Sequence, residues 1–132
     1  MILYVYTDGA SRSNPGDAGI AYVIFNEKKE LIDKHSKYIG KTTNNVAEYM
    51  ALLGAIEKVT VYSPERVYFY LDSELVVKQM NGEYKIRNTE LMKINKKIKE
   101  YTKNFECIFE YIPRELNKFA DKLAKEASYN IM

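Results

Sequence analysis

The 132-residue sequence has one cysteine, one histidine and no long apolar run. The single Cys107 cannot form an internal disulfide, which agrees with a reducing compartment, and we expect it to be a buried structural thiol rather than a reactive one. No stretch approaches the roughly 20 apolar residues that cross a membrane, and the amino terminus lacks the features of a signal peptide. We therefore expect a cytoplasmic location and no membrane partner.

Strong net charge is also missing. The sequence has 20 Lys and Arg against 18 Asp and Glu, and the resulting charge of +2 is too small to indicate nucleic-acid binding by itself. Internal repeats and low-complexity tracts are absent. The 46% hydrophobic composition supplies enough apolar material for one core, so we expect a single, monomeric domain over residues 1–132.

Hydrophobic periodicity predicts alternating strands and helices. Strands are expected at 2–7, 18–25, 31–39, 66–72 and 105–112, and helices at 44–59, 73–80, 88–104 and after Pro113 to the end. The first strand is apolar throughout, which is typical of a strand buried on both faces. The order βββαβααβα indicates an α/β fold, with a five-stranded mixed sheet and helices on both faces.

Two acidic residues close predicted strands. Asp8 ends the strand at 2–7 and Asp72 ends the strand at 66–72. In open α/β sheets the functional crevice lies beyond the carboxyl ends of parallel strands, which favours a site at these two acids. The alternative for each is an aspartate that only initiates a turn.

Two further acids belong to predicted helix starts. Glu48 follows Asn44 by four residues, and Asp121 follows Asn117 by four. Each asparagine can cap its helix by accepting a hydrogen bond from an early backbone N–H, which places each acid about one turn inside the helix. The alternative for each acid is an ordinary interaction with the helix dipole, worth roughly 0.3–1 kcal/mol.

The four acids together favour a metal site. Like charges crowded at one strand end repel one another unless protons or cations neutralise them. Carboxylate ligands without an accompanying cluster of Cys or His indicate magnesium or manganese rather than zinc. Spacing alone does not establish that the acids converge.

Four segments of the sequence resemble the motif regions of type 1 ribonuclease H. They are YTDGASRSNPG, TTNNVAEYMAL, YLDSELV and NKFADKLAKEA, and together they span most of the chain. The resemblance implies the ribonuclease H-like fold and an endoribonuclease that cuts the RNA strand of an RNA/DNA hybrid. It also implies two Mg²⁺ ions, with Mn²⁺ as a substitute, and products with 5′-phosphate and 3′-hydroxyl ends.

The resemblance assigns a role to each acid. Asp8 would bridge both metal ions, and Asp121 would help to hold the ion that activates water. Glu48 and Asp72 would hold the ion that faces the leaving oxygen. Two ions about 3.5–4 Å apart stabilise both the attacking and the departing oxygen of an in-line displacement.

The resemblance also places residues at the substrate. These residues all lie in or beside the motif segments. They are Gly9, Asn14, Thr43, Asn44, Asn45, Ser73 and Glu74. Neutral amides at Asn14, Asn44 and Asn45 suit recognition of the 2′-hydroxyl in the minor groove, and Thr43 matches a contact to a DNA-strand phosphate. As alternatives, Asn14 forms a turn and Asn44 caps a helix.

The sequence departs from the family pattern in three places. Arg114 stands in the loop where well-known members carry a histidine, and because arginine keeps its proton it can steady phosphate charge but cannot shuttle protons. The only histidine, His35, is expected to be a surface or packing residue. Glu74 occupies a position where glutamine is common, and an acid there puts strict preference for the hybrid in doubt.

The third departure is the missing aromatic-rich basic handle. Residues 85–103 instead carry seven basic and two acidic side chains, which can follow phosphates or simply form a solvated helix face. Two alternatives to a hybrid-specific nuclease stay open at this point: an enzyme of the same fold that also cuts double-stranded RNA, and a non-catalytic module that binds hybrids.

Overall fold

The computed structural model describes residues 1–130 and confirms the predicted order of elements. In chain order they are β1 (Ile2–Ser11), β2 (Gly16–Phe25), β3 (Leu31–Thr42), α1 (Asn44–Thr60), β4 (Arg66–Leu71), α2 (Glu74–Met80), α3 (Thr89–Tyr101), β5 (Glu106–Tyr111), a short 3-10 helix η1 (Arg114–Leu116) and α4 (Lys118–Ser128). None of these helices has the length and apolar character needed to span a bilayer.

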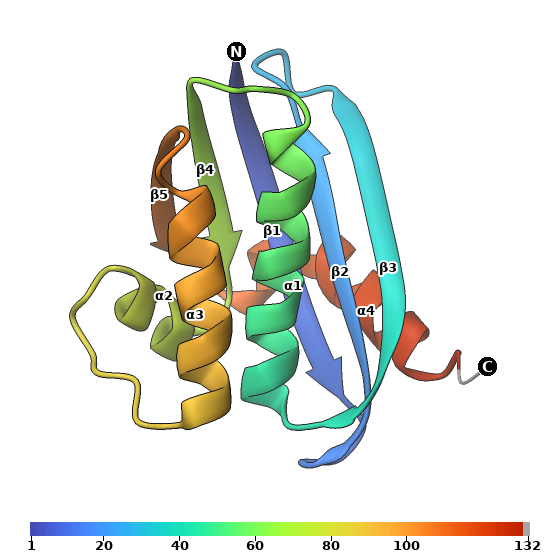
Figure 1. Ribbon diagram of the computed structural model, residues 1–132. Coiled ribbons are helices and arrows are strands. Elements are labelled where there is room, and N and C mark those ends of the chain that lie inside the picture. The colour runs from blue at the N-terminus through green and yellow to red at the C-terminus, as the bar shows by residue number, and fades with distance from the viewer. Residues whose placement is uncertain (131–132) are drawn as a thin grey trace.

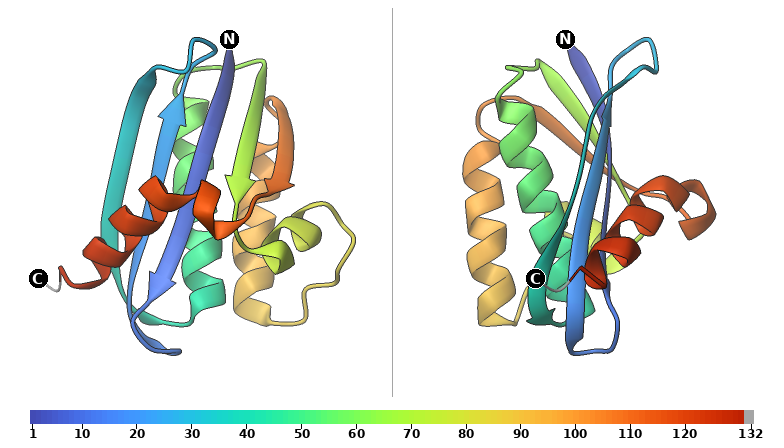
Figure 2. Two further views of the ribbon diagram at one scale, coloured as in Figure 1. Left: turned by 180° about the vertical axis from the view of Figure 1, so that it is seen from behind. Right: turned by 90° about the vertical axis from the view of Figure 1, so that its right-hand side faces the viewer.

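One mixed sheet organises the fold. Its strand order is β3-β2-β1-β4-β5. Strand β2 is antiparallel to both of its neighbours, β1 and β3, whereas β4 is parallel to both β1 and β5. Helices α1 and α3 cover one face, and α4 crosses the opposite face (Figures 1 and 2). The predicted mixed sheet with helices on both faces is therefore confirmed.

The main core lies between the sheet and the α1/α3 layer. Strand β4 alternates as predicted, and its residues Val67, Phe69 and Leu71 are fully buried. The stripe on α3 also faces this core, through Leu91, Ile94 and Ile98. The periodicity of two in the strand and 3.6 in the helix accounts for both patterns.

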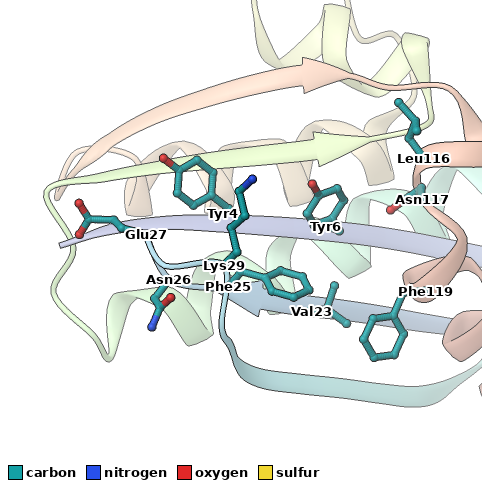
Figure 3. Close-up of a pocket in the computed structure, with 10 residues that line it drawn as sticks. All are labelled: Tyr4, Tyr6, Val23, Phe25, Asn26, Glu27, Lys29, Leu116, Asn117 and Phe119. Atoms are coloured by element: carbon teal, nitrogen blue, oxygen red, sulfur yellow. The ribbon is translucent and has the colours of Figure 1, made fainter.

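The opposite face of β1 is only partly covered, so the prediction of burial on both faces is wrong. Helix α4 crosses the β1–β3 side at one end of the sheet and leaves the other end open (Figure 2). There Tyr4 and Tyr6 of β1 and Phe25 of β2 point into a cavity of about 520 Å³, with Phe119 of α4 at its border (Figure 3). Both tyrosines are half-buried because no helix packs over them.

Strand β1 runs further than the sequence predicts. It pairs with β4 only as far as Tyr6↔Tyr70, but with β2 as far as Ser11↔Ala18. Asp8 therefore lies inside β1, at the level where the parallel neighbour has ended, and the prediction that it terminates the strand is wrong. The longer antiparallel partner keeps this segment extended.

Helix α4 begins later than its apolar pattern suggests. Leu116 belongs to η1 and is 65% exposed, whereas Ala120, Ala124 and Ala127 are buried against the sheet. The approach is close enough that a Cβ atom at Gly19 of β2 would lie 2.3 Å from the Ala124 carbonyl oxygen. Small residues on both surfaces allow this contact. At the start of α4, the Asn117 amide donates to Asp72, which directly follows β4.

Candidate active site

Three acids from separate parts of the chain meet where β4 ends beside β1, the two neighbouring interior strands of the sheet. Asp8 comes from β1, Glu48 from α1, and Asp72 from the position directly after β4. One carboxylate oxygen of each lies within 4.8 Å of the others. The convergence that spacing alone left open is therefore present for these three residues.

Glu48 is fixed in the cluster by the backbone of β1. Its side chain is 7% exposed, and its Oε1 atom accepts a 3.1 Å hydrogen bond from the Gly9 N–H. A Cβ atom at Gly9 would lie 2.2 Å from the carbonyl carbon of Ala47, so only glycine lets α1 approach this closely. The second oxygen, Oε2, is buried and has no hydrogen-bond partner among residues 1–130.

Asp121 lies at the same pocket but outside the group of three. It stands in the first turn of α4 and lines the pocket together with the other acids. Its Oδ2 atom lies 3.0 Å from the Lys125 ammonium, one turn further along the helix. The structure thus places all four predicted acids around one pocket. Three of them have carboxylate oxygens within 4.8 Å of one another, and the fourth, Asp121, is paired with Lys125.

Neither asparagine caps its helix, so both predictions of a cap are wrong. Thr43 caps α1, because its Oγ1 accepts from the Val46 N–H at 3.3 Å. The Asn117 side chain makes no capping bond, and its amide reaches β1 and Asp72 instead. At Asn44 the distant Ser11 N–H takes the oxygen that would cap the helix. At Asn117 the two bonds from Nδ2 turn the amide toward β1 and Asp72, and its buried oxygen has no hydrogen-bond partner among residues 1–130.

Burial raises the pKa values of the two innermost acids, Asp8 and Glu48, and repulsion from a neighbouring acid adds to each shift. The pKa of Asp8 is raised first by burial and then by the Glu48 charge, with smaller contributions from Asp72 and Asp121. Burial also raises the pKa of Glu48, helped by the Asp72 charge, whereas interaction with Asp8, the Gly9 N–H and the Arg114 charge lower it. Without a cation, the cluster therefore retains at least one proton near neutral pH.

The residues fit a divalent metal ion. The cluster offers only carboxylate oxygens, the donor type that magnesium and manganese prefer. The unpartnered Glu48 Oε2 is an acceptor that lacks a donor in the protein, and a bound cation would satisfy it. A cation would also offset the repulsion that raises the pKa of Asp8.

Two of the predicted substrate residues form a link between the β1–β2 turn and α1. The Oδ1 atom of Asn14 accepts from the Asn44 N–H at 3.1 Å, and the Oδ1 atom of Asn44 accepts from the Ser11 N–H at 2.9 Å. Both asparagines are exposed. Because each oxygen is used within the protein, the NH₂ groups are the parts left to donate to a ligand.

Of the remaining substrate candidates, Gly9, Asn45 and Ser73 line the same pocket, whereas Thr43 and Glu74 lie outside its lining. Asn45 is exposed and lines it, and Ser73 lines it while capping α2 through a 3.3 Å bond from the Val76 N–H. Glu74 is exposed and meets a donor, the Lys78 ammonium, at 3.0 Å. This ion pair offsets the negative charge of Glu74.

Arg114 also lines the pocket, whereas His35 lies elsewhere. The Arg114 side chain is exposed, and its charge acts on Glu48. His35 is exposed on β3, with its ring 5.5 Å from that of Tyr22. Lys125 is a pocket residue that the sequence reading missed, although its position four residues after Asp121 was a usable signal.

Comparison with known proteins places this geometry in a family. Residues 6–127 match the reverse transcriptase-like family. A bifunctional protein of Mycobacterium tuberculosis is 35% identical over 129 residues, which cover 96% of this chain and 35% of that protein. The chain thus spans about a third of the length of its mycobacterial relatives.

Two solved structures resemble the chain over nearly their whole length. LC11 ribonuclease H1, isolated from compost and solved with an RNA/DNA hybrid, is 42% identical with a TM-score of 0.90, and the match covers 95% of both chains. Ribonuclease H1 of Halobacterium salinarum is 33% identical with a TM-score of 0.92, and the match covers 96% of this chain and 97% of that one. With its fold, acidic pocket and relatives in agreement, the chain belongs to the type 1 ribonuclease H family.

Proposed function

We propose that this protein is an endoribonuclease that hydrolyses the RNA strand of RNA/DNA hybrids with two bound Mg²⁺ ions. Water attacks the phosphorus atom, the bond to the 3′ oxygen breaks, and the products carry 5′-phosphate and 3′-hydroxyl ends. The observation that carries this proposal is the convergence of carboxylate oxygens from Asp8, Glu48 and Asp72 within 4.8 Å in a chain of this family.

We assign the metal ligands to the four acids. Asp8 would hold both ions, Asp121 would help to hold the ion that activates water, and Glu48 and Asp72 would hold the ion that faces the leaving oxygen. When bound, two divalent ions stabilise the attacking and departing oxygens. The chain's own contribution is to fix the carboxylates: the Gly9 N–H holds Glu48, β1 carries Asp8 within the strand, and Asp72 follows the end of β4.

The amide groups of Asn14, Asn44 and Asn45 are proposed to read the minor groove. In support, the oxygens of Asn14 and Asn44 are used within the protein and both side chains are exposed beside the pocket. Thr43, Gly9, Ser73 and Glu74 complete the proposed substrate surface. The enzyme is proposed to act as one monomeric domain in the cytoplasm, and the hybrid-bound state of LC11 supports the substrate class.

The test is cleavage of one labelled sequence in three forms: RNA/DNA hybrid, double-stranded RNA and double-stranded DNA. We expect cutting of the hybrid in Mg²⁺, none with chelator, and loss of cutting by at least about 100-fold in Asp72→Asn, because a ligand of the reacting centre is lost. Equal cutting of double-stranded RNA would show a relaxed enzyme. Hybrid binding without cutting by the wild type would show a non-catalytic module.

A further inference from the structure

Asn117 connects three parts of the acidic pocket. Its side chain is 1% exposed and lies between η1 and α4. The Nδ2 atom donates to the Thr7 carbonyl at 2.8 Å and to Asp72 Oδ2 at 3.1 Å. Its backbone carbonyl accepts from the Asp121 N–H at 3.0 Å. One residue therefore touches Asp72, Asp121 and the peptide unit that precedes Asp8.

The two side-chain bonds use both hydrogens of the amide. The bond to Thr7 anchors Asn117 to β1, and the bond to Asp72 transfers that anchor to the acid beyond the end of β4. Figure 3 shows Asn117 beside β1, beyond Tyr6. Because both donors are occupied, the amide has one orientation, and Asp72 is held relative to the strand that carries Asp8.

Asp72 needs such a partner in this setting. It is half-buried, follows the last residue of β4, and has an oxygen within 4.8 Å of Asp8 and Glu48 oxygens. Repulsion from neighbouring acids favours rotamers that turn its carboxylate toward solvent. A hydrogen bond from a fixed amide to a carboxylate opposes that rotation, since bonds to charged groups are stronger than neutral ones.

We propose that Asn117 is a positioning residue, which orients Asp72 for metal binding by fixing it to the main chain of β1. This inference rests on the proposed function, because it takes the acidic cluster to be the metal site. A purely structural Asn117 would stabilise η1 and α4 against β1 and leave metal affinity unchanged. The two roles differ in what happens to metal binding in a folded variant.

The test is Mn²⁺ binding, measured by calorimetry and by the spin-resonance signal of free Mn²⁺, in wild type and Asn117→Ala. We expect affinity to fall about 10-fold, the lower end of what loss of an outer hydrogen bond to a metal ligand costs. Asn117→Ser, which keeps a small polar side chain, serves if Asn117→Ala does not fold. Turnover should fall while the KM for the hybrid stays unchanged.

A double-mutant cycle identifies the route. If Asn117 acts through Asp72, then Asn117→Ala causes no further loss of Mn²⁺ affinity in an Asp72→Ala background. The matched control is Asn81→Ala, since the Asn81 amide donates to the Phe109 carbonyl at 3.2 Å and makes no hydrogen bond to an acid among residues 1–130. Asn81→Ala should change melting temperature but not Mn²⁺ affinity.

Two results would overturn the inference, and they differ from failure of the proposed function. One is unchanged Mn²⁺ affinity in folded Asn117 variants. The other is an equal loss with and without Asp72, which would show that Asn117 acts on the pocket in general. A wild type that binds no Mn²⁺ would refute the metal site itself, and the role of Asn117 with it.

Discussion

The Lys125 ammonium lies 3.0 Å from the Asp121 carboxylate, at the rim of the acidic pocket. A metal ion that binds Asp121 competes with this lysine. The Lys125 side chain is 58% exposed, so the pair contributes only about 0.2–1 kcal/mol. We therefore expect Lys125→Ala to tighten Mn²⁺ binding by up to about five-fold at low salt.

High salt should remove this difference, because screening already weakens an exposed pair. Lys122→Ala on the same helix is the control, since Lys122 forms no ion pair with any residue of 1–130. Calorimetric titration at two salt concentrations makes the measurement. Weaker binding in Lys125→Ala would show that the lysine supports the metal rather than competing with it.

The metal-free protein should lose stability as pH rises. The folded-state pKa values of Asp8 and Glu48 lie above their ordinary values, mainly through burial, so the folded protein binds more protons than the unfolded chain. The free energy of unfolding that these two acids contribute is fully present below about pH 4. It is lost as pH rises through their folded-state pKa values, by up to about 1.4 kcal/mol per pH unit for each proton.

Urea unfolding with chelator from pH 5 to 8 measures this slope. Asp72, Asp121 and Arg114 face the same pocket, so Asp8→Asn is the variant that isolates the central proton. We expect Asp8→Asn to be more stable than wild type at pH 7 and to have a flatter slope. Identical slopes would contradict the assignment.

Arg114→Ala should slow turnover and leave metal binding largely intact. The guanidinium lines the pocket but is exposed and cannot bind a cation, so its proposed partner is phosphate charge. Loss of one charge-assisted contact of about 1.5–3 kcal/mol predicts at least about ten-fold slower turnover.

Arg66→Ala is the matched control for this prediction. The Arg66 guanidinium pairs with Glu106 at 2.7 Å, on strands β4 and β5 away from the pocket. Steady-state cleavage of the hybrid and Mn²⁺ titration are measured in parallel. An unchanged rate in Arg114→Ala would remove the proposed role.

Gly9→Ala should be strongly destabilising, whereas Gly54→Ala should not. A Cβ at Gly9 would meet the backbone of Ala47 at 2.2 Å, so α1 must move, and we expect a loss of about 3 kcal/mol or more. Gly54 lies within helix α1. A Cβ atom there would meet Tyr22 Cε2 of β2 at 3.7 Å, which is an ordinary van der Waals distance.

We expect Gly54→Ala to gain about 0.5–1 kcal/mol, because alanine has the higher helix propensity. Urea unfolding measures both variants, and Mn²⁺ titration of Gly9→Ala reports whether Glu48 has moved. Wild-type stability in Gly9→Ala would show that α1 tolerates displacement from β1.

Local patterns predicted most of the secondary structure. Alternation in β4 and the apolar stripe of α3 depend on neighbours within each segment, and both were confirmed. The true end of β1 was missed because it depends on pairing with β2 as far as Ser11↔Ala18. The cap predicted at Asn117 was wrong, because its amide donates instead to the Thr7 carbonyl, 110 positions away in the chain.

The sequence by itself determined the order of elements, the motif acids and the resemblance to ribonuclease H, because these are encoded in residue type and spacing. Only the tertiary structure decided that Asp8, Glu48 and Asp72 share one site while Asp121 pairs with Lys125. It also decided which asparagines bond across the chain. The physical reason is that distances between side chains are fixed by sheet register and helix packing, which local periodicity does not specify.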